Sequence, residues 1–137
     1  MDRFEEFLEA LGALLGTSLY PDRNRICQLR MHDTVHIILT PDENKQSLVV
    51  LGPICEVPPG AFKERVFKEA LKANANFPRI GTLGYCARKN QLALFTYFPL
   101  FELKAQTIAD CLPPFAKTIE DWRSAIEKST PFPSLSP

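Results

Sequence analysis

The segment over residues 57–77 carries a wide apolar stripe, and this stripe constrains the fold more than any other feature. Two prolines end the preceding element, and large apolar side chains then recur at steps of three and four residues, the spacing of one helix face. These residues are Phe62, Val66, Ala70, Ala73 and Phe77, and Phe67 and Leu71 widen the stripe. A helix that covers one sheet face of a small domain needs a narrower band, and exposed apolar patches mark interaction surfaces. We therefore predict a dimer with this helix at or beside its dyad.

The remaining elements follow from periodicity and turn signals. An amphipathic stripe from Phe4 to Leu15, with Asp2 and Glu5 as a cap and Gly16 as a stop, predicts a first helix. Alternating or β-branched runs predict strands at residues 26–31, 35–39, 47–54, 80–86 and 92–98. Helical pieces follow at residues 103–111 and 115–126, and Pro113-Pro114 between them either kinks one helix or separates two.

This order predicts an α+β fold in one domain, an α/β sandwich of order α-β-β-β-α-β-β-α whose antiparallel sheet is flanked by helices. The domain is expected to cover residues 1–129, because folding of a chain of 137 residues buries enough surface for a core without disulfides. Residues 130–137 hold three prolines and little to bury, so we expect a disordered tail.

Charge and cysteine use exclude several classes of function. Sixteen basic residues balance sixteen acidic ones, which argues against nucleic acid as a partner. No run is long enough to span a membrane, and the acidic N-terminus is unlike a signal peptide, so we expect a cytoplasmic protein without membrane insertion. The cysteines, Cys27, Cys55, Cys86 and Cys111, show no C-x-x-C spacing, which favours buried thiols over disulfides or zinc.

Candidate catalytic groups are few. His32 and His36 lie four residues apart on a turn and a strand, and no third metal ligand accompanies them. Neighbouring strands could bring Cys27 close to His36, which leaves a cysteine-dependent hydrolase or thiol enzyme as the competing enzymatic hypothesis. Nothing local marks an activated thiolate, however, so we predict a binding protein with no catalytic residues, metal or cofactor.

Several stretches together resemble the Tir-chaperone (CesT/SycE-like) family of class I type III secretion chaperones, over residues 3–128. The resemblance is carried by FEEFLEALGALLG in the first helix, LYPDRNRICQLRMHDTVHIIL in the first hairpin and SLVVLGPICEVPP before the central helix. It continues with FKERVFKEALKANA in that helix, the GTLGY strand and IEDWRSAIEK near the end.

The resemblance implies a bacterial homodimer that binds a segment near the N-terminus of one or more secreted effectors, or of a secretion-gate protein. The bound segment stays extended and soluble for export. The implied dimer interface consists of Phe62, Val66, Phe67, Ala70, Leu71, Leu83 and Tyr85. The implied cargo-binding surface, beside an edge strand at residues 26–31, consists of Leu14, Leu15, Leu19, Ile26, Gln28, Arg30 and Ile38.

One departure from the family and one open alternative bear on this interpretation. Many members are acidic whereas this chain is neutral, so a cargo steered mainly by charge is disfavoured. Some relatives pair with a sister chaperone, and a regulatory module of the same fold that binds a secretion or transcription regulator remains the alternative function.

Overall fold

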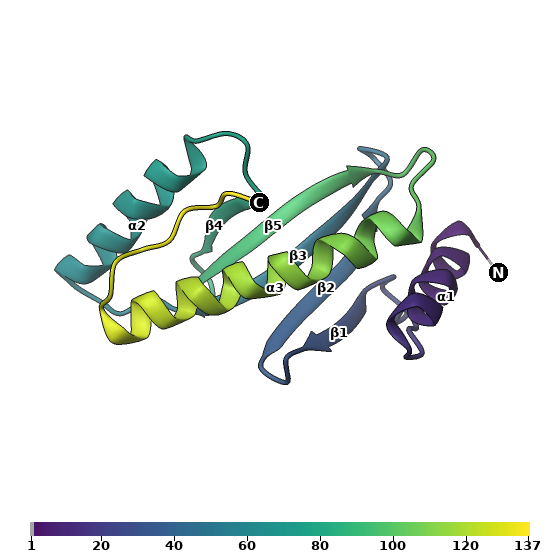
Figure 1. Ribbon diagram of the computed structural model, residues 1–137, viewed down its shortest axis with the longest axis horizontal. Coiled ribbons are helices and arrows are strands. Elements are labelled where there is room, and N and C mark those ends of the chain that lie inside the picture. Colours follow the sequence, from purple (N-terminus) through teal and green to yellow (C-terminus); the bar gives the residue numbers. More distant parts are fainter. Residues whose placement is uncertain (1) are drawn as a thin grey trace.

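The computed structural model describes residues 2–137 and has the predicted order of elements (Figure 1). The elements are α1 (Arg3–Leu15), β1 (Cys27–Met31), β2 (Val35–Asp42), β3 (Ser47–Glu56), α2 (Ala61–Asn74), β4 (Thr82–Cys86), β5 (Gln91–Pro99) and α3 (Ala105–Lys128). The predicted α+β class and the five antiparallel strands are confirmed.

The five strands form one sheet in the order β1-β2-β3-β5-β4. The first three strands form an antiparallel meander, and β5 then pairs with β3 so that β4 lies outside it. The two edges are therefore β1 and β4, and the prediction that residues 26–31 form an edge strand is confirmed. The two edges differ in how their outward backbone groups are satisfied.

Helix α3 crosses one face of the sheet (Figure 1). The contact is close at Gly52, where an added Cβ would lie 2.2 Å from Ile119 Cδ1 and 3.3 Å from Phe115 Cε1. Alternate residues of β2 and β3 on this face are fully buried, among them Ile37 and Val50. Helix α2 packs against β4, and α1 packs against α3. The molecule thus has two layers, with α2 and α3 covering the same face of the sheet.

Helix α3 passes through its two prolines as a single helix of 24 residues. Pro113 and Pro114 are exposed, whereas Leu112 and Phe115 on either side are fully buried. The missing proline N–H groups therefore fall on the solvent side, and Thr118 Oγ1 donates a hydrogen bond to the Pro114 carbonyl. Of the two sequence-based alternatives, the structure selects one continuous helix.

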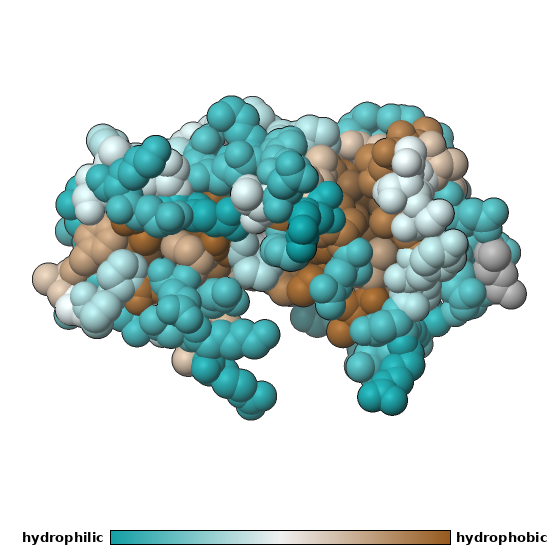
Figure 2. Space-filling model, turned by 90° about the horizontal axis from the view of Figure 1, so that it is seen from below, coloured by the Kyte–Doolittle hydropathy of each residue, from teal (hydrophilic) through white to brown (hydrophobic). Residues whose placement is uncertain are grey.

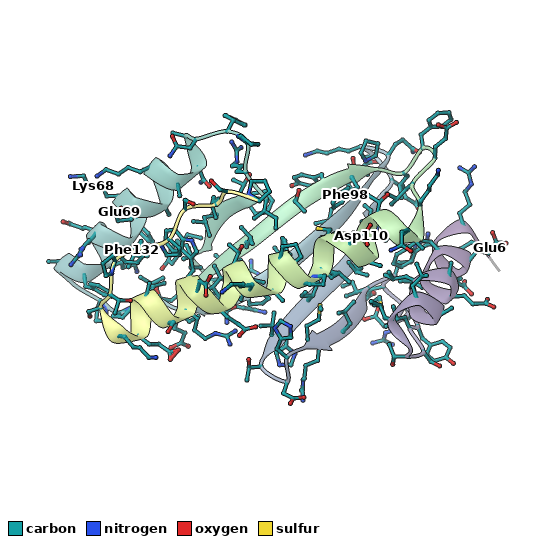
Figure 3. The ribbon with its side chains drawn as sticks, viewed as in Figure 1. Glu6, Lys68, Glu69, Phe98, Asp110 and Phe132 are labelled. Carbon is teal, nitrogen blue, oxygen red and sulfur yellow. The ribbon has the colours of Figure 1, made fainter. Side chains whose placement is uncertain are left out.

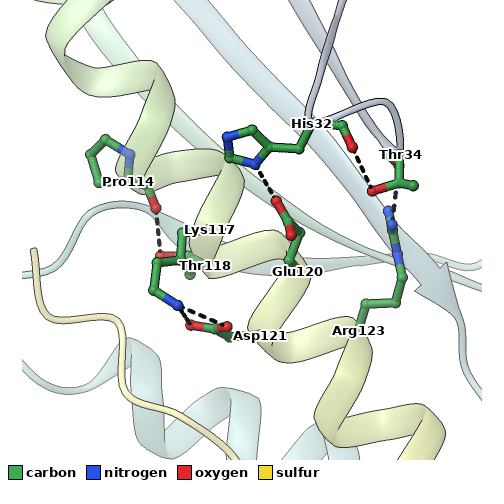
Figure 4. A network of polar contacts seen from close by, with 8 residues as sticks. All are labelled: His32, Thr34, Pro114, Lys117, Thr118, Glu120, Asp121 and Arg123. Atoms are coloured by element: carbon green, nitrogen blue, oxygen red, sulfur yellow. Dashed lines mark hydrogen bonds and ion pairs between the residues drawn. The ribbon is translucent and has the colours of Figure 1, made fainter.

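Polar contacts fix the β1–β2 hairpin to α3 (Figure 4). Arg123 Nε donates to the Ile54 carbonyl at 2.8 Å, and its Nη1 donates to the Thr34 carbonyl at 3.1 Å. His32, in the hairpin turn, contacts Glu120 through its Nδ1. These bonds hold the hairpin, and with it the edge strand β1, in a defined position relative to the core.

The tail over residues 130–137 is packed against the domain, which corrects the expectation of disorder. The ring of Phe132 lies 5.2 Å from that of Trp122 and 6.4 Å from that of Phe62. Leu135 is only 2% exposed, and its carbonyl accepts a hydrogen bond from the Ile80 N–H at 2.8 Å. The proline content suggested disorder, but the two large apolar side chains have a core to pack on.

Candidate functional site

The sheet face opposite α2 and α3 is uncovered, and we call it the open face. Strand register places Gln28 opposite Ile38, Ile38 opposite Leu51, and Leu51 opposite Phe95. Leu51 points away from α3, because the adjacent Gly52 is the residue that contacts that helix. By the same alternation, the open face consists of Gln28, Arg30, His36, Ile38, Val49, Leu51, Pro53, Ala93, Phe95 and Tyr97.

The open face is apolar at its centre. Ile38, Leu51 and Phe95 form a continuous cross-strand row, and each is only half-buried. The Phe95 ring packs edge-on against Tyr97 at 5.7 Å. Arg30 and His36, paired with each other, are the basic residues named for this surface and lie at its β1 side. The arrangement offers an uncharged strip that leads to a sheet edge.

The predicted cargo residues fall in three environments. Gln28, Arg30 and Ile38 belong to the open face. Leu14 is 50% exposed on α1, Ile26 is half-buried just before β1, and Leu15 is half-buried against the core. Leu19 is 9% exposed and belongs to the core cluster, but it also lines a surface depression beside α1, so its place in the cargo surface stays a prediction.

The row residues Leu51 and Phe95 were missed by the sequence analysis, although a signal for them exists. Strand β3 is apolar at almost every position, so its outward side chains are apolar as well as its inward ones. A strand that is apolar on both faces indicates that both faces are covered. Among the described residues, no helix covers the second face of β3.

A second surface lies on α2, β4 and the segment that joins them, and we call it the α2–β4 surface; it consists of Phe67, Leu71, Phe77 and Tyr85. The rings of Phe67 and Tyr85 pack edge-on at 4.8 Å, and Lys63 Nζ lies 5.0 Å from the Tyr85 ring centre. Leu71 is 70% exposed and Phe77 is 77% exposed. Large apolar side chains are therefore presented to solvent by adjacent parts of the chain.

The structure divides the seven predicted interface residues. Phe67, Leu71 and Tyr85 lie on the α2–β4 surface. Val66, Ala70 and Leu83 are at most 7% exposed and pack inside the subunit, so they offer little area to a partner. Phe62 is covered by Phe132 of the tail. The correction has a simple cause: a helix that packs on a sheet uses the centre of its own stripe to do so.

The free edge of β4 is capped by a side chain. Asn74, the last residue of α2, accepts a hydrogen bond from the Leu83 N–H at 2.8 Å and donates one to the Leu83 carbonyl at 3.0 Å. The amide thus occupies both outward backbone groups of this residue, as a neighbouring strand would. Side-chain caps of this kind prevent edge-to-edge pairing of sheets.

Two depressions of about 510 Å³ lie at the α1 end of the molecule. One is lined by Phe4 and Phe7 of α1 and by Leu103 before α3, with Arg3 and Glu43 among its charged residues. In Figure 2, hydrophobic residues reach the surface toward this end of the molecule and are framed by polar ones. Apolar floors with charged rims can receive side chains of a protein partner.

The proposed cysteine–histidine pair does not form. Cys27 is fully buried on the helix-covered face, whereas His36 is exposed on the open face. Burial also raises the pKa of the Cys27 thiol, which disfavours the thiolate. Within residues 2–137, no group of three or more His, Cys, Asp or Glu side chains is arranged to hold a metal ion. No helix of the described part of the chain is long and apolar enough to cross a membrane.

The sequence pattern of the Tir chaperone protein (CesT) family matches residues 6–123. The chain belongs to this family. Among curated proteins, none matches the sequence. The predicted family is therefore confirmed over most of the chain, including α1, the whole sheet and most of α3.

Solved structures share the fold of this CesT-family chain at low sequence identity. A chain of the HopA1-SchA chaperone-effector complex has a TM-score of 0.72 at 18% identity and covers 91% of this chain and 99% of its own. A chain of the ExsC-ExsE complex has a TM-score of 0.70 at 14% identity, with coverage of 92% and 97%. A chain of the ExoU-SpcU complex, from the type III secretion system of Pseudomonas aeruginosa, has a TM-score of 0.67 at 12% identity and covers 90% of this chain and 98% of its own.

Proposed function

We propose that this CesT-family protein is a cytoplasmic chaperone of bacterial type III secretion that acts as a homodimer. It binds an extended segment near the N-terminus of one or more secreted effectors, or of a secretion-gate protein, and keeps the segment soluble and non-globular for export. Binding needs no cofactor and no catalytic step, because the chaperone works by offering a surface.

The row of Ile38, Leu51 and Phe95 on the open face is the observation that supports this proposal best. It leads to the edge strand β1, whose outer side pairs with no strand among the described residues. An exposed edge can hydrogen-bond the backbone of any sequence, while the apolar row selects for large apolar side chains. Because the row is uncharged, it fits cargo chosen by apolar pattern rather than by charge.

The α2–β4 surface supports the homodimer. Leu71 and Phe77 present apolar area that water disfavours, and a second copy would bring the same patch in a two-fold arrangement. Since Asn74 already occupies the edge of β4 at Leu83, the two copies are expected to meet through side chains at this position rather than through a continuous sheet.

The cargo proposal is tested by affinity capture of three tagged proteins from native cells: wild type, Ile38→Glu and the control Thr107→Glu. Thr107 is exposed on α3, away from the open face, so its substitution adds the same charge without touching the row. Co-purified proteins are lightly proteolysed and identified by mass spectrometry. Wild type and Thr107→Glu should retain a protected segment near the N-terminus of a secreted protein, and Ile38→Glu should lose it.

Equal capture by all three proteins would show that the open face does not bind cargo. Capture of a sister chaperone or a regulator in place of a secreted protein would support the heterodimeric or regulatory alternative instead.

A further inference from the structure

The C-terminal tail follows a path between two helices. Helix α3 ends at Lys128, and its C-cap Ser129 has a positive φ of 54°. The chain then turns back and runs between α3 and α2 toward β4 (Figure 1). Phe132 lies between these helices in Figure 3. The tail is thus a short extended peptide bound to the surface of the domain that precedes it.

Two side chains anchor the tail, and they contact residues from separate elements. Phe132 packs on the rings of Trp122 from α3 and Phe62 from α2, and the Arg65 guanidinium lies 5.9 Å from its ring centre. Three positions later, Leu135 is 2% exposed, beside Ile80. We call the receiving surface the tail site; its residues are Phe62, Arg65, Ile80 and Trp122.

The tail is held by few bonds. Within the described residues, one hydrogen bond joins residues 131–137 to the rest of the chain, from the Ile80 N–H to the Leu135 carbonyl. Pro131, Pro133 and Pro137 have no N–H to donate. Segments with few backbone bonds and few buried contacts open locally without global unfolding. The tail can therefore leave its site while the sheet and helices remain folded.

We propose that the tail site is a peptide-binding site and that the tail is its tethered occupant. When the tail leaves, the site takes an extended segment of a partner protein with an aromatic residue followed three positions later by a leucine or similar side chain. The tail itself is the argument for this chemistry, since it shows which residues the site accepts and at what spacing. The site lies on the helix-covered side of the sheet, so this inference does not rest on cargo binding at the open face.

The site has a built-in reporter, because Trp122 is the only tryptophan of the chain. It is fully buried and packs on Phe132, so removal of the tail should expose it to water and shift its fluorescence emission to the red. The test variant is the full-length chain with Phe132→Ala and Leu135→Ala. The matched control carries Ser134→Ala and Ser136→Ala, two exposed positions of the same tail.

The ligand used is a synthetic peptide with the sequence of residues 130–137. A short tether gives the tail a millimolar effective concentration, so a tail docked nine-tenths of the time corresponds to a peptide dissociation constant of order 0.1 mM. The apparent constant for wild type should be about tenfold weaker, because the tail competes. In the Phe132→Ala/Leu135→Ala protein, the peptide should return the emission toward the wild-type wavelength, and a peptide with both anchors replaced by alanine should not.

The proposal is overturned if this variant, folded by circular dichroism and cooperative in urea, keeps wild-type emission or shows no saturable binding of the peptide. Hydrogen exchange of the unaltered protein provides a second measurement. The Ile80 amide should exchange at least tenfold faster than the paired amides of β3, because tail release alone exposes it. Exchange at the same rate as β3 would show that the tail opens only with global unfolding and would also overturn the proposal.

Discussion

Replacement of Leu71 by aspartate should dissociate the proposed dimer without unfolding the subunit. The side chain is 70% exposed on α2, so the folded monomer makes little use of it. This distinguishes Leu71 from Val66, also on α2, which is fully buried. A charge at Val66 would unfold the core and would say nothing about the interface.

The expected magnitude follows from the exposed area. Complete burial of a leucine side chain is worth about 1.5–3 kcal/mol, so covering the exposed 70% of Leu71 contributes about 1–2 kcal/mol. A two-fold interface contains the residue twice, which gives about 2–4 kcal/mol per dimer. The dimer dissociation constant should therefore rise by roughly 30- to 700-fold, and the cost of desolvating two carboxylates adds to this.

Sedimentation equilibrium over a range of concentrations measures this constant for wild type, Leu71→Asp and a control. The control is Leu14→Asp, which places the same charge on an exposed leucine of α1, away from the α2–β4 surface. A Leu71→Asp constant within twofold of wild type, or a wild type that stays monomeric at high concentration, would refute the interface.

Three further predictions concern stability, each measured by urea unfolding. Asn74→Ala removes both hydrogen bonds to Leu83 and should cost about 1–3 kcal/mol, with more aggregation as the β4 edge opens. Leu135→Ala should lower the free energy of unfolding by no more than about 1.4 kcal/mol, because a tail docked nine-tenths of the time stabilises the fold by that amount. By comparison Leu112→Ala, in the centre of α3, should cost about 2–5 kcal/mol. Burial raises the pKa of the Cys27 thiol in the folded protein. The free energy of unfolding should therefore be constant with pH below the ordinary thiol pKa and should fall as the pH rises through the pKa of the folded protein. In Cys27→Ala this fall should be less steep.

The order of elements could be predicted because periodicity carries it. Alternating, β-branched or continuously apolar runs between turn signals identified the strands, and steps of three and four residues identified the helices. The continuity of α3 through Pro113 and Pro114 could not be predicted, because it depends on which side of the helix the prolines face. That side is set by the packing of Leu112 and Phe115 on the sheet, which is a tertiary contact.

The candidate surfaces were predicted less completely than the fold. The resemblance pointed to a strand that is a sheet edge and to a helix with exposed apolar side chains, but it could not say which side chains of a stripe point inward. Leu19 and Val66 were assigned to surfaces and are buried, whereas Leu51 and Phe95 of the open face were overlooked. Strand pairing decides such cases, since Phe95 meets Leu51 only because β5 returns beside β3.

The width of the α2 stripe, which first suggested a dimer, has three separate causes. Val66 and Ala70 pack within the subunit core, and Phe62 is covered by Phe132 of the tail. Only the other apolar residues of the stripe are available to a second copy, and Leu71 is the most exposed of those on the helix. A helix with more apolar residues than its sheet contact needs is therefore covered by another part of the structure. The tail of the same chain has to be considered as this cover before a partner protein is.

The two sheet edges also differ in whether the chain itself already satisfies their backbone groups. At β4, Asn74 satisfies the outward backbone groups of Leu83, so an added strand would gain no backbone bonds at that residue. At β1, the adjacent open face supplies an apolar row that includes Ile38, so an added strand would gain both backbone bonds and apolar contacts. The asymmetry agrees with the proposed division, in which the α2–β4 surface packs on a second copy through side chains and β1 accepts a cargo strand, so that one subunit binds both at the same time.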